Sequence, residues 1–206
     1  MGQEPHREGV IKYRVVHQPG PPVPWEIIAD LEQWRQTLRA QGWLGQYPDG
    51  TSYGNVSQRH PQRGLVITAT QVAHRPQLTS SDYVHVTHYD PATHTLTVIG
   101  SAPASSEAPT HWAIYDLHPE IQVVFHIHAP DLWQRLLHHP EIPCTDPAIP
   151  YGTQAMAREI RRLYPPGANP FARPCFVMAG HQDGVFSFGR TAIEAGQALL
   201  RWVMLD

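Results

Sequence analysis

Two histidines alternate with apolar residues in the segment Phe125-His126-Ile127-His128. The run that contains them, residues 123–128, is rich in β-branched and aromatic side chains, which favours a strand. Because the side chains of a strand alternate between its two faces, both imidazoles would lie on one face and could chelate one metal ion. The alternative is that the pattern arises by chance, which is easier in a chain with 14 histidines.

A third metal ligand must come from elsewhere in the chain, and His181 is the candidate. It follows an expected strand and stands between Gly180 and Gly184, where the backbone can approach another group closely. Taken alone, a single histidine between glycines is a weak signal for a ligand.

A polar loop, Ser105-Ser106-Glu107, precedes an expected helix that begins at Pro109. The amino-terminal end of a helix attracts anions, so a carboxylate or phosphate of a substrate could bind there. The alternative is capping of the helix by Ser106, with Glu107 as a first-turn acid. A second polar segment, residues 51–59, offers Asn and Ser side chains around Gly54 and could equally be a turn.

The elements that must position these residues can be placed from hydrophobic periodicity and from the positions of proline, glycine and threonine. Helices are expected at residues 25–41, at 109–117, and after the capping residues Thr153 and Thr191. Strands are expected at residues 65–70, 83–88, 95–99, 123–128, 175–178 and 185–188. The second and third of these strands form a predicted hairpin, and residues 44–64 look too irregular for a long element.

Mixed helices and strands without strict alternation predict an α/β fold, a three-layer αβα sandwich with a mixed, mostly antiparallel central sheet. The length of 206 residues predicts one domain, residues 25–206. It is preceded by a proline-rich arm, residues 1–24, whose composition disfavours regular structure.

Composition and charge argue against several classes of partner. No apolar run approaches the roughly 18–20 residues that cross a bilayer, so no membrane partner is expected. A formal net charge of −3 without a basic stripe argues against nucleic acid. The first residues lack the basic and apolar regions of a secretory signal, so a cytoplasmic location is expected.

Four polar segments, in this order and at these spacings, resemble the class II aldolase/adducin family, which includes zinc-dependent sugar-phosphate aldolases. The resemblance covers roughly residues 25–203. The matching residues are Ser52-Tyr53-Gly54-Asn55-Val56-Ser57-Gln58-Arg59, Ser105-Ser106-Glu107 with His111, Val124-Phe125-His126-Ile127-His128, and His181.

The resemblance implies that His126, His128 and His181 bind a divalent ion, usually zinc and otherwise Mn²⁺, Co²⁺ or Fe²⁺. It implies that Glu107 is a ligand in the resting state and also the catalytic acid or base. Three neutral imidazoles would leave the ion its charge and an open coordination position, and such an ion polarises carbonyl groups.

For the substrate, the resemblance implies that Gly54, Asn55, Ser105 and Ser106 hold its phosphate or other anionic end. The expected function is that of a metal-dependent aldehyde-lyase of carbohydrate metabolism. Such an enzyme acts on a small hydroxy-carbonyl or sugar-derived substrate through a metal-stabilised enediolate. A homotetramer is expected by the same resemblance. The alternatives are an epimerase, dehydratase or decarboxylase on the same site, or a noncatalytic adducin-like interaction module.

Two departures from the family pattern concern the substrate. Sugar-phosphate aldolases have a glycine in the anion-binding loop where this chain has Gln71 after Thr70, which puts phosphate binding in doubt. They also use a tyrosine after the H-x-H segment as a proton donor, but residues 129–149 contain none. Trp133 and Tyr151 are the nearby candidates.

Overall fold

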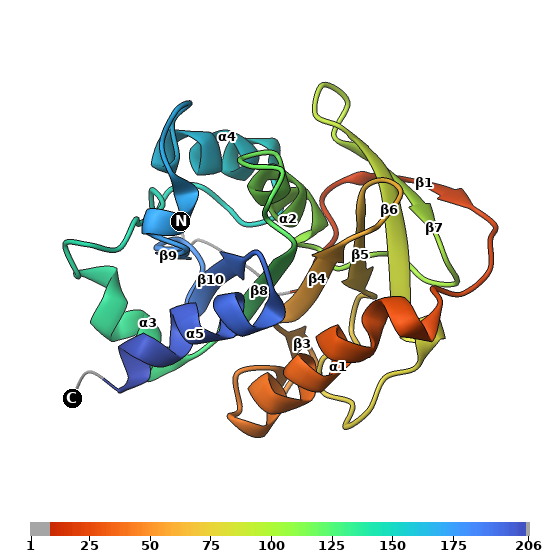
Figure 1. Ribbon diagram of the computed structural model, residues 1–206, viewed down its shortest axis with the longest axis horizontal. Helices are drawn as coiled ribbons and strands as arrows, with labels where there is room; N and C mark the ends of the chain where they lie inside the picture. Colours follow the sequence, from red (N-terminus) through yellow and green to blue (C-terminus); the bar gives the residue numbers. More distant parts are fainter. Residues whose placement is uncertain (1–8, 205–206) are drawn as a thin grey trace.

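The computed structural model describes residues 9–204, through which an eight-stranded sheet runs (Figure 1). In spatial order its strands are β1 (Arg14–Gln18), β7 (Thr95–Ile99), β6 (Tyr83–Asp90), β5 (Leu65–Thr68), β4 (Asn55–Arg59), β8 (Val123–His128), β10 (Gly184–Gly189) and β9 (Cys175–Val177). In this sheet β1 and β7 pair in parallel, and the other described pairs are antiparallel. A separate ribbon pairs β2 (Gly45–Gln46) with β3 (Ser52–Tyr53).

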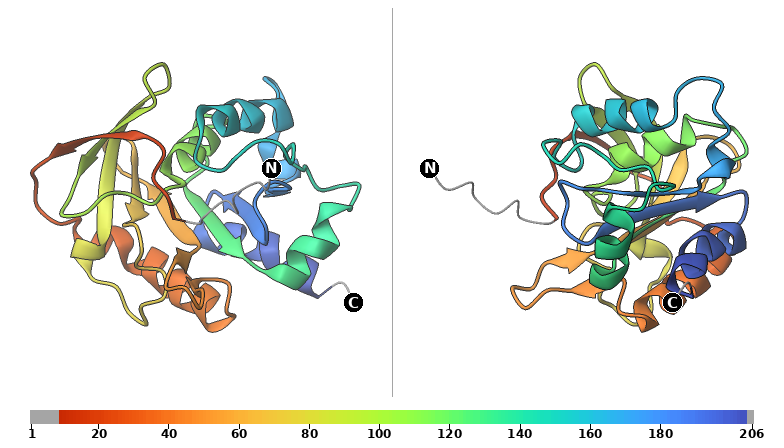
Figure 2. Two further views of the ribbon diagram at one scale, coloured as in Figure 1. Left: turned by 180° about the vertical axis from the view of Figure 1, so that it is seen from behind. Right: turned by 90° about the vertical axis from the view of Figure 1, so that its left-hand side faces the viewer.

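Helices cover both faces of the large sheet (Figures 1 and 2). One face packs against α2 (Ala108–Tyr115) and α4 (Gln154–Leu163). The other face packs against α1 (Trp25–Ala40), α3 (Pro130–Leu137) and α5 (Ala192–Val203). The predicted three-layer sandwich with a mixed, mostly antiparallel sheet is therefore confirmed.

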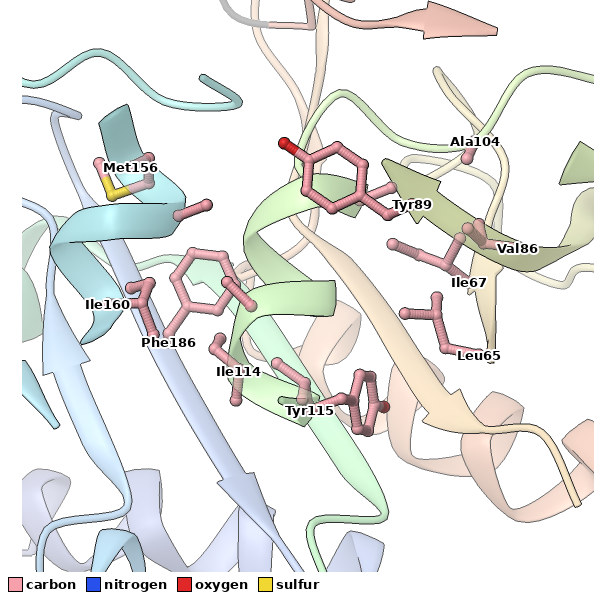
Figure 3. Close-up of a cluster of buried hydrophobic side chains, with 14 of the residues drawn as sticks. Leu65, Ile67, Val86, Tyr89, Ala104, Ile114, Tyr115, Met156, Ile160 and Phe186 are labelled. Atoms are coloured by element: carbon pink, nitrogen blue, oxygen red, sulfur yellow. The ribbon is translucent and has the colours of Figure 1, made fainter. Parts of the chain in front are cut away.

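Strand β8 contributes to the cores on both faces of the sheet. Val124 belongs to the cluster beneath α2 and α4, which also contains Ile114, Ile160 and Phe186 (Figure 3). Phe125 and its second neighbour Ile127 belong to the cluster beneath α1, α3 and α5. Because side chains alternate along a strand, residues 126 and 128 face the α2/α4 side together with Val124.

The predicted elements are present with their ends shifted by a few residues. The predicted hairpin is the antiparallel pair β6–β7, and the long first helix is α1. Thr153 and Thr191 cap their helices as predicted, because their hydroxyl oxygens accept hydrogen bonds from Met156 N (3.2 Å) and Glu194 N (3.1 Å).

Several elements differ from the expectations. Strand β4 lies inside the stretch expected to be irregular, and α3 begins at Pro130, where proline suits the first helical position. Strand β1 lies in the proline-rich arm, where its exposed residues pair with β7 at the sheet edge. Residues 1–8 of that arm lie outside the described residues. Short 3₁₀ helices occupy Ser80–Asp82 and Pro170–Ala172. No helix in residues 9–204 has the length and apolar character of a membrane span.

Candidate metal centre

Three buried histidines meet at one end of the central strands. His126 and His128 come from β8, and His181 comes from the turn between β9 and β10. Nε2 of His128 lies 3.2 Å from Nε2 of His126 and 3.1 Å from Nε2 of His181. Among the described residues, these three form the one group of potential ligand atoms lying within 4.8 Å of one another.

This geometry fits a metal ion better than a hydrogen-bonded cluster. A single ring nitrogen carries either one proton or one lone pair, so His128 Nε2 cannot donate to one neighbour while it accepts from the other. Two nitrogens that each lie about 2.0–2.1 Å from a tetrahedral zinc ion are about 3.3–3.4 Å apart, which is close to the observed separations. The three histidines therefore fit a divalent ion such as zinc.

The rings are held in a state that suits ligation. Burial, and then the neighbouring His128 and His181, keep the pKa of His126 well below its ordinary value, so this imidazole stays neutral. Nδ1 of His128 and the Tyr47 hydroxyl lie 2.8 Å apart. A hydrogen bond there fixes the orientation of the ring and leaves Nε2 for an ion. The sequence pattern did not reveal this contact of Tyr47 with His128.

Glycines allow the close approach of His181. The backbone N–H of Gly184 donates to the His181 carbonyl oxygen (3.0 Å), which closes the turn between β9 and β10. A Cβ atom on Gly184 would lie 2.6 Å from Cδ2 of His181, and one on Gly180 would lie 2.4 Å from the carbonyl oxygen of Pro147. Larger side chains at either glycine would displace the ligand.

Asn55 lies directly opposite His126 in the β4–β8 register. Its Oδ1 accepts a hydrogen bond from Nε2 of His111 (2.6 Å), and Nδ1 of His111 then accepts from the Ser57 hydroxyl (2.6 Å). The Tyr115 hydroxyl completes the chain by donating to Ser57 Oγ (2.9 Å). Burial lowers the pKa of His111 to about 3, so the network remains neutral. His111 therefore anchors the side chain of Asn55.

Glu107 is the N-cap residue of α2 and is fully buried. Its Oε2 accepts a hydrogen bond from the Thr110 hydroxyl (2.6 Å), and its carboxylate is outside the group of three histidines. Ser105 and Ser106 precede it and are buried. The side chain of Ser106 does not cap α2, contrary to the alternative considered from the sequence. That Glu107 ligates the ion stays a prediction.

Close backbone contacts tie the two polar loops to the centre. Gly54 adopts φ +78°, and a Cβ atom there would lie 3.1 Å from the carbonyl oxygen of His126. A Cβ atom on Gly152 would lie 2.6 Å from the carbonyl oxygen of Ser106. The next residue back, Tyr151, has its ring 4.7 Å from the ring of His181. Gly54 therefore borders the histidine group, and Ser106 borders the segment that carries Tyr151.

The two departures from the family pattern have visible consequences. Gln71 adopts φ +60°, a region that favours glycine, and its Oε1 accepts a hydrogen bond from the backbone N–H of Ser52 (2.8 Å). Of the two candidate proton donors, Trp133 donates its Nε1–H to the Met178 carbonyl oxygen (2.9 Å). Tyr151 is the candidate whose ring contacts a histidine of the centre.

The family assignment follows from the sequence as a whole. A family model described as "Class II Aldolase and Adducin N-terminal domain" matches residues 47–203. The chain belongs to the class II aldolase and adducin family. The match spans the three histidines, Glu107 and both polar loops of this aldolase/adducin chain, and the resemblance identified from the motifs is confirmed.

Solved structures described as aldolases, or as a putative aldolase, share this fold. An L-fuculose 1-phosphate aldolase has a TM-score of 0.66 at 17% identity, over 88% of this chain and 82% of that chain. YgbL from Klebsiella pneumoniae, described as a putative aldolase/epimerase/decarboxylase, has a TM-score of 0.63 at 18% identity, over 87% and 86%. A sugar-phosphate aldolase from Thermotoga maritima has a TM-score of 0.58 at 18% identity, over 86% and 90%. At these identities the likeness shows the fold alone.

Proposed function

We propose that this chain is a divalent-metal-dependent aldehyde-lyase that cleaves or forms a carbon–carbon bond in a small hydroxy-carbonyl or sugar-derived substrate. The observation that supports this most strongly is the convergence of three buried Nε2 atoms, from His126, His128 and His181, inside a chain of the class II aldolase and adducin family. A noncatalytic adducin-like module would have no need of three mutually facing imidazoles in its interior.

A bound ion would polarise a substrate carbonyl group and offset the negative charge that develops as the carbon–carbon bond breaks. His126, His128 and His181 would hold that ion, with zinc as the expected metal. Glu107 would move the proton, either as a general base on a substrate hydroxyl or as a general acid in the reverse direction. Its carboxylate is buried and is therefore shielded from bulk water.

Gly54, Asn55, Ser105 and Ser106 are the proposed contacts to the substrate. The side-chain oxygen of Asn55, Oδ1, accepts a hydrogen bond from His111. The N–H₂ group of the same amide is therefore the group that can donate to a ligand. Ser105 and Ser106 offer hydroxyl groups just before the first turn of α2, where anions are favoured.

A second candidate is an epimerase, dehydratase or decarboxylase that uses the same ion and Glu107. It is favoured by the lack of any tyrosine among residues 129–149, because aldol cleavage in sugar-phosphate aldolases relies on a tyrosine there as a proton donor. We also propose a cytoplasmic homotetramer active in carbohydrate metabolism, on the strength of the family. Sedimentation of a species of 23.2 kDa, the mass of one chain, would contradict the tetramer.

The test is a screen of zinc-loaded protein against phosphorylated and nonphosphorylated hydroxy-carbonyl compounds, with aldehyde release measured by a coupled dehydrogenase. The lyase proposal expects aldehyde from at least one compound and none from the Glu107→Gln variant. Epimerised, dehydrated or decarboxylated products without aldehyde would favour the second candidate. Turnover that does not change on metal removal would contradict both.

A further inference from the structure

A buried hydrogen-bond network ends beside the metal centre and has a fixed order of protons. Its members are Asn55 and Ser57 from β4 and His111 and Tyr115 from α2, and all four are buried. Tyr115 is the last residue of α2 (Figure 3). Asn55 is at the other end of the network, opposite His126 in the β4–β8 register. The network therefore connects the interior of the protein with the centre.

The tyrosine hydroxyl sets the order of the protons. It has one proton and two acceptors within reach, Ser57 Oγ at 2.9 Å and the Gln122 carbonyl oxygen at 3.5 Å. The shorter contact is the better hydrogen bond, so Tyr115 donates to Ser57. Within residues 9–204, the remaining partner of Ser57 Oγ is Nδ1 of His111 at 2.6 Å. Ser57 therefore donates its own proton to His111.

This order fixes the side-chain amide of Asn55. Burial lowers the pKa of His111 to about 3, so the ring is neutral and carries one N–H. Because Nδ1 accepts from Ser57, that N–H is on Nε2, which lies 2.6 Å from Asn55. An N–H donor needs an oxygen acceptor, so the amide turns Oδ1 towards His111 and its N–H₂ group away. The reverse order would leave the Tyr115 hydroxyl only the 3.5 Å contact with Gln122.

The N–H₂ group of Asn55 is the open end of the network. Within residues 9–204 this group makes no hydrogen bond. Its nitrogen is not one of the fully buried polar atoms that lack a partner, so it reaches space that water or a ligand can enter. That space borders the centre, because Asn55 pairs with His126 and a Cβ atom on Gly54 would lie 3.1 Å from the His126 carbonyl oxygen.

Stability alone does not require a fixed orientation of this amide. Water can donate to an amide oxygen or accept from an amide nitrogen, so it would satisfy the open end in either orientation. A ligand group that only accepts hydrogen bonds can use one of the two orientations. Three buried side chains, those of Ser57, His111 and Tyr115, hold Asn55 in that one.

We propose that His111 and Ser57 are positioning residues, which hold the N–H₂ group of Asn55 towards the substrate and thereby select a substrate group that accepts hydrogen bonds. Carbonyl, carboxylate and phosphate oxygens meet this requirement, whereas an ammonium group does not. This inference rests on the proposed function and deepens it, because it names the residues that set the polarity of one substrate contact.

The first experiment uses the two asparagines of the chain, Asn55 and Asn169. Labelling asparagine side chains with an NMR-active nitrogen isotope gives one N–H₂ signal from each. Asn169 is an exposed internal control, and its Oδ1 accepts a hydrogen bond from Phe171 N (3.1 Å). Without metal, the N–H₂ protons of Asn55 should exchange freely with water, as those of Asn169 do. Strong protection of the Asn55 protons would place this group inside the network and overturn the inference.

The second experiment adds small ligands to the zinc-loaded full chain. Glycolate offers carboxylate oxygens as acceptors, and ethanolamine offers an ammonium group in their place. Glycolate should shift the Asn55 signal and leave the Asn169 signal unchanged, and ethanolamine should shift neither. Glycolate that binds by calorimetry without moving the Asn55 signal would contradict the inference, as would a shift of the same size with ethanolamine.

Two variants separate positioning from a structural role. His111→Leu removes both hydrogen bonds of the ring, whereas the amide of His111→Gln can accept from Ser57 and donate to Asn55. His111→Leu should raise the Kd of glycolate about tenfold, the loss of one hydrogen bond to a charged ligand, with zinc affinity unchanged. His111→Gln should recover most of the glycolate affinity. Equal losses in both variants, or a parallel loss of zinc, would indicate a structural role and overturn the inference.

The failure of this inference and that of the proposed function are distinguishable. Wild-type protein that takes up no zinc would contradict the proposed function, whereas proton exchange in the metal-free chain still tests the orientation of Asn55. If His111→Leu does not fold, that experiment and the glycolate shift in wild-type protein decide the inference.

Discussion

Two buried polar clusters lie on opposite faces of the sheet and are built in opposite ways. In the first, Arg35 of α1 directs all five of its N–H donors at oxygen atoms: two bonds to Glu32 (2.6 and 2.8 Å) and three to backbone carbonyls of residues 73, 75 and 76. The Tyr83 hydroxyl adds a bond to Glu32 (2.7 Å). In the second, His126, His128 and His181 turn the same atom, the ring nitrogen Nε2, toward one another.

The difference separates a structural cluster from a site. The Glu32–Arg35 cluster is complete in itself: burial alone would raise the pKa of Glu32, but its hydrogen bonds outweigh burial and hold the pKa below its ordinary value. Three imidazoles whose ring nitrogens lie this close together form a ligand set that a divalent ion would complete, as the proposed function requires. Both clusters are buried. What distinguishes the structural cluster from the candidate site is whether each hydrogen-bond donor is paired with an acceptor.

The largest expected effect is on metal binding. His126→Ala should lower zinc affinity by several orders of magnitude, because it removes one of the three protein ligands. Metal content after dialysis and reloading, measured by mass spectrometry, checks this. His138→Ala at an exposed position is the control and should bind as wild type does. Full zinc content in His126→Ala would contradict the site.

Turnover should fall by about 10²–10⁴-fold in Glu107→Gln, since general acid–base catalysis contributes about that much. The neutral amide can still accept the Thr110 hydrogen bond, so the local structure should persist. Steady-state kinetics with a substrate from the screen provide the measurement. Thr110→Val removes that hydrogen bond but keeps the carboxylate, and it should reduce turnover less.

A change in the Glu32–Arg35 cluster should lower the stability of the fold and leave metal binding unchanged. Arg35→Met leaves the buried Glu32 carboxylate uncompensated, which should lower the free energy of unfolding by about 3–5 kcal/mol. Urea unfolding gives this value, and the double variant with Glu32→Gln should recover part of it. If the folded single variant loses its zinc, the two clusters are not independent.

A smaller effect is expected from the residue that orients His128. Tyr47→Phe removes the hydroxyl that lies 2.8 Å from Nδ1 of His128. Loss of a hydrogen-bond partner of a ligating histidine lowers metal affinity by about ten- to a hundredfold, and the same loss of zinc affinity is expected here. Competition with a chromophoric chelator measures this. Tyr53→Phe is a matched control, because its ring is 5.5 Å from that of His128 but its hydroxyl donates to Gly42 (3.1 Å).

A separate effect is expected on acid stability. His111 has a pKa of about 3 when folded and 6.5 ordinarily, so between these values the unfolded state binds the extra proton. Stability contributed by neutral His111 is therefore present above pH 6.5 and is lost towards pH 3, at up to about 1.4 kcal/mol per pH unit. His111→Gln should flatten the pH dependence of urea unfolding. An unchanged slope would show that folding does not lower the pKa of His111.

Much of this site follows from the sequence, because local spacing carries it. The period of two places His126 and His128 on one face, as the structure shows. Strand β4 was missed because Asn55 and Ser57 look solvent-exposed in the pattern, and their burial depends on His111, which is more than 50 residues away. Tyr47 was missed for the same reason: its contact with His128 joins residues 81 positions apart.

The central claim is that three histidines hold one divalent ion, and anomalous X-ray diffraction at the zinc edge tests it most directly. A crystal grown with zinc should show one strong anomalous peak about 2.0–2.1 Å from Nε2 of His126, His128 and His181. A peak at another position, such as the stacked His60 and His85 rings, or no peak among these three nitrogens, would contradict the account.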